Sequence, residues 1–158
     1  MKAPCVVLFL LAAGIPLASG GELTLSTGID WMAGVRGGFE WLFLPRSGIQ
    51  AHAGVSIGGA ATGDLLIVHR LFAGPRGFSL RLLAGIPNAL FPFGASELMV
   101  SLGAAVESRW RLARGIGLSV RAGEGYPFFF AQGQYASKAV RYPFGLWPDL
   151  FLGLWFEM

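Results

Sequence analysis

The feature that most constrains this chain is an alternation of apolar with polar or small side chains, which recurs from residue 22 to the last residue. In the first such segment Leu23, Leu25 and Ile29 lie on one side of a two-residue period, and Glu22 and Asp30 lie on the other. Similar segments begin near residues 38, 49, 65, 78, 97, 116 and 150, separated by stretches rich in glycine, proline or arginine. Because successive side chains of a strand point to opposite faces, the alternation predicts an all-β chain of eight strands.

The length of these segments indicates that the apolar side of each strand faces lipid. Strands of about ten residues, tilted by about 45°, climb about 25 Å, which is the height of the apolar band of an outer-membrane barrel. Hydrophobic residues make up 54% of the chain and charged residues 13%, whereas soluble domains carry about 25% charged residues. The sequence therefore predicts a closed antiparallel transmembrane up-and-down β-barrel of eight strands, with its apolar sides toward lipid and its polar sides enclosed. Two other folds were weighed, a spanning helix over residues 82–106 and a soluble β-sandwich or lipocalin-like barrel; prolines and glycines argue against the helix.

Residues 1–20 have the composition of a cleaved secretory signal peptide. Lys2 precedes an apolar run over residues 6–11, Pro16 breaks it, and the small residues Ala18 and Gly20 follow. This run is too short to span a membrane as a helix. The one cysteine, Cys5, lies inside this segment. The exported part, residues 21–158, is therefore predicted to be the barrel, without disulfide bonds or a lipid anchor.

The polar sides of the strands supply the first candidate site, a charged lumen. The interior of an eight-stranded barrel is just wide enough to be filled by side chains. Charges of both signs enclosed there must pair or be hydrated. Two interpretations stay open: a polar plug, or a narrow ion path whose salt bridges exchange partners. The candidate lumen residues are Glu22, Asp30, Glu40, Gln50, His52, Arg81, Glu97, Glu107, Arg109 and Arg121.

The second candidate site is an aromatic stretch before the last strand, which we expect to form an external loop. One interpretation places these rings in extended strands, as an interfacial aromatic girdle. The other is a capture site for a small apolar ligand, or a patch that contacts lipid or a host. The residues concerned are Tyr126, Phe128, Phe129, Phe130, Tyr135, Tyr142, Phe144 and Trp147.

Catalytic and metal chemistry receive little support from the sequence. His52 and Ser56 share one face of a strand but are four residues apart, about 13 Å, which is too far for a hydrogen bond. A partner for His52 on a neighbouring strand stays open, so a lipid-modifying hydrolase is the alternative to a non-enzymatic protein. The spacing of His and Cys predicts no metal site, and no cofactor is expected. Arginines interleaved with acidic residues argue against a nucleic-acid surface.

The last strand carries a resemblance to a known class. Gly153, Phe156 and Met158 match in part the C-terminal assembly signal of small outer-membrane barrels, with Met158 in place of the usual terminal aromatic residue. The mature chain resembles the eight-stranded barrels of outer membrane proteins A, X and W of Gram-negative-type bacteria. That resemblance implies an outer-membrane location, both termini in the periplasm, short periplasmic turns at residues 45–47, 74–77 and 113–115, and recognition by the barrel assembly machinery. The implied role is structural, a minor permeability or surface binding, with membrane lipids as partners and ions or a small apolar ligand as candidate partners. The alternatives are a hydrophobic-ligand carrier and a lipid-modifying enzyme.

Overall fold

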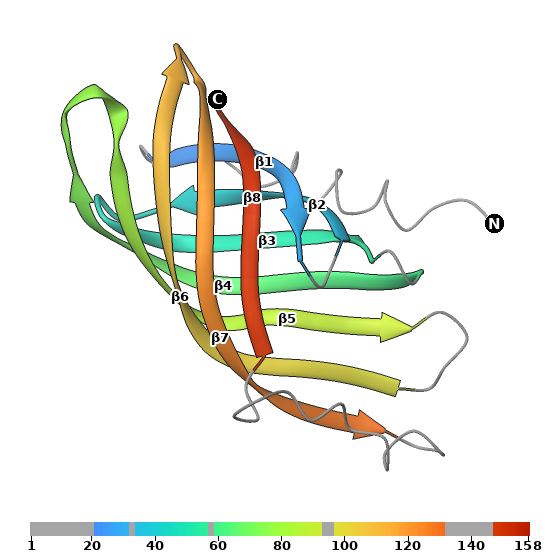
Figure 1. The fold of residues 1–158 in the computed structure, drawn as a ribbon. Helices are drawn as coiled ribbons and strands as arrows, with labels where there is room; N and C mark the ends of the chain where they lie inside the picture. Colours follow the sequence, from blue (N-terminus) through green and yellow to red (C-terminus); the bar gives the residue numbers. More distant parts are fainter. Residues whose placement is uncertain (1–20, 32–33, 57–58, 93–96, 132–146) are drawn as a thin grey trace.

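A computed structural model describes residues 21–31, 34–56, 59–92, 97–131 and 147–158 of the 158-residue chain, so the expected signal peptide lies outside the described residues. The described chain forms one closed barrel of strands in sequence order (Figure 1). Its strands are β1 (Glu22–Asp30), β2 (Gly34–Leu42), β3 (Ser47–Val55), β4 (Ala60–Ala73), β5 (Ser79–Pro92), β6 (Glu97–Ala113), β7 (Ile116–Ala131) and β8 (Trp147–Glu157). The predicted all-β, eight-stranded, up-and-down antiparallel fold is confirmed.

Closure of the barrel explains why the alternation continues to the end of the chain. β8 pairs with β1 from Thr24 opposite Glu157 to Asp30 opposite Phe151. Neither strand is left with an unpaired edge, so the terminal residues are held as firmly as those of an internal strand. The stretch weighed as a helix, residues 82–106, instead supplies parts of β5 and β6. No helix among the described residues has the length and apolar character needed to cross a membrane.

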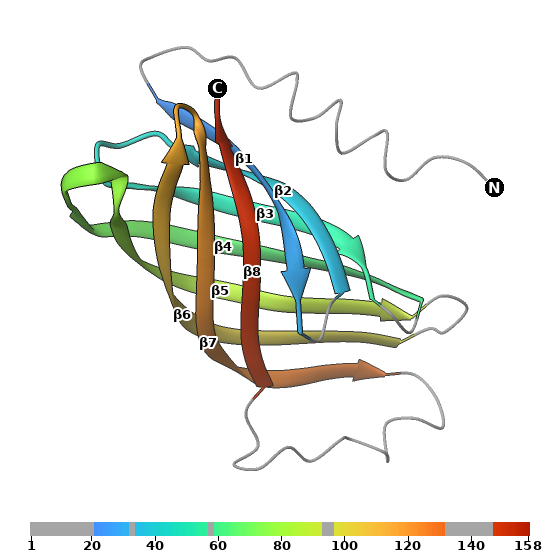
Figure 2. The ribbon, with the colours of Figure 1, turned by 45° about the horizontal axis from the view of Figure 1, so that its top comes forward.

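The two ends of the barrel differ, and we name them the turn end and the loop end. The turn end holds three short connections, at residues 43–46, 74–78 and 114–115, together with the start of β1 and the end of β8 (Figure 2). There the Glu157 amide donates to the Gly115 carbonyl at 2.9 Å. Gly115 has a φ of 74°, a conformation that glycine adopts without steric cost in a two-residue hairpin turn. The loop end holds the opposite strand ends, from Asp30 and Gly34 to Ala131 and Trp147.

Several strands are longer than the sequence predicts. The alternating segments begin near residues 38 and 65 in the sequence, whereas β2 begins at Gly34 and β4 at Ala60. β5 runs through Pro87 to Pro92 and β7 runs on to Ala131, 14 and 16 residues long. Glycine and proline weaken local strand preference, but pairing with two neighbours overrides it. The ladder accommodates Pro87 at an irregularity between Gly85 and Asn88.

The barrel buries polar side chains and exposes apolar ones. The inward face carries buried arginines and carboxylates, whereas the outward face carries exposed Ile29, Ile67, Leu102 and Leu152. For the strands whose two faces the sequence assigned, the burial agrees with that assignment. In β4, where the sequence left the register open, Leu66 and Val68 point inward and Leu65 and Ile67 outward. A small apolar cluster lines part of the lumen: Leu42, Leu66, Val68, Leu83 and Ala105.

Candidate functional site: the charged lumen

The part of the lumen nearer the turn end holds one compact set of charges, which we name the turn-end cluster: Glu40, Arg81, Glu107 and Arg109. Arg109 donates to Glu107 at 2.9 Å through Nε and to Glu40 at 2.8 Å through Nη2. Arg81 forms an ion pair with the same Glu40 carboxylate. All four residues are buried. Two guanidinium groups therefore face two carboxylates, which offsets the cost of removing each charge from water.

A second set of charges lies nearer the loop end and joins seven strands. We name it the loop-end cluster: Asp30, Arg36, His52, Asp64, Asn88, Arg121 and Asp149. Asp64 is its centre, accepting from Arg36 at 3.1 Å, from Arg121 at 2.9 Å and from the His52 ring at 2.9 Å. Arg121 also donates to Asp149 at 3.0 Å, and Arg36 donates to Asn88 at 2.6 Å. This network ties together strands that are far apart in the sequence.

Phe151 covers one side of the loop-end cluster. Its ring centroid lies 5.3 Å from that of His52 and 5.2 Å from the Arg121 guanidinium carbon. An aromatic face so placed attracts a desolvated cation and excludes water from the ion pairs beside it. Phe151 is buried and shares the inward phase of Asp149 and Gly153 on β8.

His52 completes a chain of three side chains along one cross-strand row. Ser26 Oγ lies 2.7 Å from His52 Nε2, and His52 Nδ1 lies 2.9 Å from Asp64. The Asp64 carboxylate also accepts the His52 backbone amide at 3.0 Å. Since an ionised carboxylate only accepts, His52 Nδ1 carries a proton, and in the neutral ring Nε2 is left to accept from the Ser26 hydroxyl. The cross-strand partner that the sequence left open for His52 is thus Asp64 on β4, with Ser26 on β1.

Gly38 makes this row possible. It lies between Ser26 and His52 in register, opposite Ser26 in the β1–β2 ladder and opposite His52 in the β2–β3 ladder. A Cβ added at Gly38 would lie 2.6 Å from His52 Cδ2, so the imidazole occupies the space that a side chain would need. The absence of a side chain on β2 lets His52 reach across that strand to β1.

Gln50 stands out as a buried amide without a partner. It lies two residues from His52 on the inward face of β3 and is only 1% exposed. Neither its Oε1 nor its Nε2 has a hydrogen-bond partner among the described residues. Because a buried amide without hydrogen bonds costs several kcal/mol by transfer estimates, roughly 2–7, this position favours a water molecule or a ligand group beside Gln50.

The candidate lumen residues of the sequence fall into three groups. Most are inward and buried as expected; these are Asp30, Glu40, Gln50, His52, Arg81, Glu107, Arg109 and Arg121. Glu22 is a correction: its side chain is 64% exposed and forms an ion pair with Arg70 at the turn-end rim, because β1 begins at this residue. Glu97 is the first residue of β6, and its side chain lies outside what the structure describes.

Sequence reasoning missed Arg36, Asp64 and Asn88 because all three lie outside the alternating segments that it defined, and it left Asp149 out of the network. All four are buried and contact the loop-end cluster. A usable signal existed for two of them. Continuing the two-residue phase of β2 backward from Glu40 reaches Arg36, and continuing that of β4 backward from Leu66 reaches Asp64.

The exposed ion pair between Glu22 and Arg70 at the turn-end rim leads to a first prediction. Glu22→Gln removes one partner of an exposed ion pair with Arg70. Exposed pairs contribute about 0–1 kcal/mol, so we expect the free energy of unfolding in detergent to fall by less than about 1 kcal/mol. Urea titration followed by tryptophan fluorescence measures it, and a loss as large as that of a buried pair would show that the rim is closed to solvent.

A cavity of about 490 Å³ opens at the turn end, below the turn-end cluster. Arg70, Arg81, Arg109 and Arg111 all line it, together with Thr24 and Trp155. The Nε atoms of Arg70 and Arg81 are buried and have no hydrogen-bond partner within the described part of the chain. Four guanidinium groups thus line the cavity, and Glu22 and Glu157, which also line it, pair with Arg70 and Arg111.

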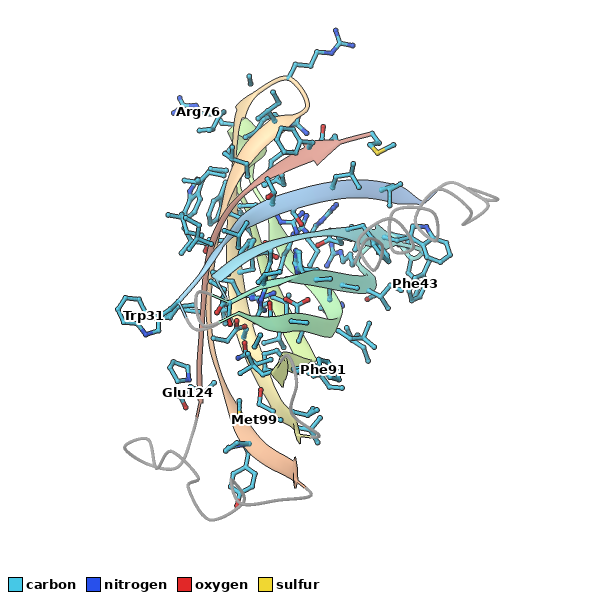
Figure 3. All side chains as sticks on the ribbon, turned by 90° about the vertical axis from the view of Figure 1, so that its right-hand side faces the viewer. Trp31, Phe43, Arg76, Phe91, Met99 and Glu124 are labelled. Atoms are coloured by element: carbon cyan, nitrogen blue, oxygen red, sulfur yellow. The ribbon has the colours of Figure 1, made fainter. Side chains whose placement is uncertain are left out.

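Aromatic side chains gather on the outside at both ends. At the loop end Trp31, Phe91 and Tyr126 are exposed, with Trp31 at 77%, and at the turn end Phe43 and Trp110 are exposed. Figure 3 shows Trp31 and Phe43 projecting away from the barrel. Tyr126 and Phe128–Phe130 lie in β7, and Trp147 opens β8, so these positions are strand and not loop. Tyr135, Tyr142 and Phe144 lie outside the described residues.

The residues of the expected assembly signal occupy the closing strand. Gly153 faces inward opposite Gly28 of β1, and Phe156 faces outward opposite Leu25. Met158 follows the strand and is 76% exposed, and its amide donates to the Leu23 carbonyl at 3.2 Å. Gly153 and Phe156 thus lie in the seam between β1 and β8, and Met158 lies directly after it.

Known proteins add no further constraint. Comparison with protein-family models, with curated proteins and with solved structures finds no match to this chain. Within the described ranges, no three His, Cys, Asp or Glu side chains are grouped so as to hold a metal ion.

Proposed function

We propose that this chain is an exported bacterial outer-membrane β-barrel protein with a sealed lumen and a structural role in the envelope. The observation that carries the proposal is the outer surface: an apolar band around the closed barrel, with exposed aromatic side chains at both of its ends. Such a band with two aromatic girdles is the surface that a lipid bilayer and its two interfaces favour. In water the same surface would be an aggregation hazard.

The interior supports a plug over a pore. Each arginine of the two charge clusters is within 4 Å of a carboxylate. Apolar side chains such as Leu66 and Leu83 line the wall between the clusters. An ion crossing the barrel would have to separate buried pairs in both clusters, and breaking one such pair costs about 3–5 kcal/mol. A stable conducting path is therefore not the function that this arrangement favours.

The proposal also names partners. Membrane lipids would contact the outward face, and the two girdles would lie at the headgroup levels. The barrel assembly machinery would act on β8, the strand that closes the seam with β1. Residues 1–20 would direct export and be removed. The outward direction of Trp31, Phe91 and Tyr126 supports the girdle interpretation over an apolar capture site.

A reconstitution experiment tests the proposal. The purified protein should need detergent or lipid to stay monodisperse, and it should migrate faster on a gel unheated than boiled, as closed barrels do. In planar bilayers it should give no steady channel events. Monodispersity in plain buffer would contradict the membrane location, and regular conductance steps would contradict the sealed lumen.

A further inference from the structure

We propose that Ser26, His52 and Asp64 form a nucleophilic triad inside the lumen, which hydrolyses small acyl esters. Two contacts support this proposal: Ser26 Oγ lies 2.7 Å from His52 Nε2, and His52 Nδ1 lies 2.9 Å from Asp64. Nucleophile, base and orienting acid within hydrogen-bond reach of one another are the signature of an activated serine. A plug needs none of this order, because any paired set of charges would fill the space.

The supporting contacts hold the imidazole in one orientation. Asp64 binds both the ring and the backbone amide of His52, and it is itself held by Arg36 and Arg121. Phe151 lies against the ring, and Gly38 leaves room for it. A base fixed by packing and by hydrogen bonds meets the geometric demand of catalysis better than one on a loop.

Gln50 supplies the hydrogen-bond donor that an ester hydrolase needs beside its nucleophile. Its amide lies in the next cross-strand row toward the turn end, opposite Glu40 in register, whereas His52 is opposite Gly38. Its Nε2 is a buried donor without a partner among the residues described. In the proposed reaction this donor stabilises the oxygen that becomes negative when the ester carbonyl is attacked.

The turn-end cavity supplies the route and the substrate class. Ser26 is 6% exposed and lies one row deeper than the cavity, since its strand neighbour Thr24 and its register partner Trp155 both line the cavity. Arg81 and Arg109 line that space, whereas Glu40, the carboxylate that both contact, is not among the lining residues. A small ester that carries a carboxylate or phosphate would bind its anionic group at these arginines, with its acyl group toward Ser26.

The proposed reaction uses only the ester and water. Ser26 Oγ bonds to the acyl carbon while its proton moves to His52 Nε2. The carbon–oxygen bond to the alcohol then breaks, and the alcohol leaves with that proton. Water attacks the acyl-serine, gives one proton to His52, and its oxygen stays with the released acid; His52 then returns the proton to Ser26.

The test uses the full protein, folded in detergent micelles. A fluorophosphonate probe should label Ser26, located by mass spectrometry of the digested protein, and the protein should hydrolyse 4-nitrophenyl succinate faster than neutral 4-nitrophenyl acetate. Ser26→Ala should abolish labelling, and His52→Gln should slow it at least about 100-fold. Gln50→Leu should slow ester hydrolysis about 100-fold.

The matched control is Ser119→Ala, which removes another buried lumen serine, one that donates to the Gly153 carbonyl. It should keep the labelling and hydrolysis rates of the wild type. Heat-modifiable gel migration shows which variants are folded, and only those are compared. Labelling that persists in Ser26→Ala, or a folded wild type that neither takes up the probe nor cleaves either ester, would overturn the triad. A preference for the acetate would overturn the anionic substrate class, and an unchanged rate in Gln50→Leu would overturn the role of that amide.

Discussion

Asp64→Asn is expected to lower the free energy of unfolding by about 3–5 kcal/mol, the cost of breaking a buried ion pair from one side. The substitution keeps the size of the side chain and removes its charge. Arg36 and Arg121 lose a carboxylate at 3.1 and 2.9 Å, while the His52 ring loses its charged acceptor. Both arginines stay in place without water to replace the lost partner. Equilibrium unfolding in urea, with the protein in lipid vesicles, measures the loss.

Two further variants separate charge from packing at this position. Glu157→Gln removes a carboxylate from the exposed pair with Arg111 at the rim, and we expect a loss of less than about 1 kcal/mol. The double variant Asp64→Asn with Arg36→Gln removes one charge of each sign. Because the two residues are in contact, its loss should be smaller than the sum of the single losses. Additive losses would mean that the contact between Arg36 and Asp64 contributes nothing to stability.

The architecture could be predicted from the sequence because alternation has a direct physical cause. Each strand of the barrel has one face toward the lumen and one toward the outside. Once the direction of one side chain is known, the two-residue period gives the direction of every other side chain in that strand. This is why the sequence predicts the inward positions of Glu40, His52 and Arg121, which the burial of these side chains confirms. It also explains the assignment of Phe151 and Trp155, large apolar residues that share the inward phase of β8.

The residues that form the candidate site could be predicted only in part, because their grouping depends on the register between strands. Alternation assigns a face but not the register between strands, and the register decides that Ser26, Gly38, His52 and Asp64 form one row. Asp64 also fell just outside the segment that begins at Leu65, because the glycines around residues 58–63 obscured the start of β4. A single sequence holds too little information to align four strands, so the neighbours of His52 could not be named from it.

Gly38→Ala is expected to destabilise the barrel at the row that holds His52. The added Cβ would lie 2.6 Å from His52 Cα and closer still to the Ala51 carbonyl oxygen. Both are backbone atoms of β3, which cannot rotate away, so β2 and β3 must separate locally. Overpacking typically costs about 1–3 kcal/mol, and here we expect the upper part of that range or a failure to fold.

The adjacent residue offers the control. Gly37 belongs to the same strand but faces outward, and a Cβ there would meet only the Ser26 carbonyl oxygen at 3.7 Å, an ordinary contact. Gly37→Ala should therefore fold and unfold like the wild type in the same urea titration. Any Gly38→Ala protein that folds should also label more slowly at Ser26, because the methyl group takes the space in which the His52 ring reaches β1. Equal stability of the two variants would mean that the close approach of β2 and β3 at Gly38 relaxes without cost, and the row from Ser26 to Asp64 would then not depend on that glycine.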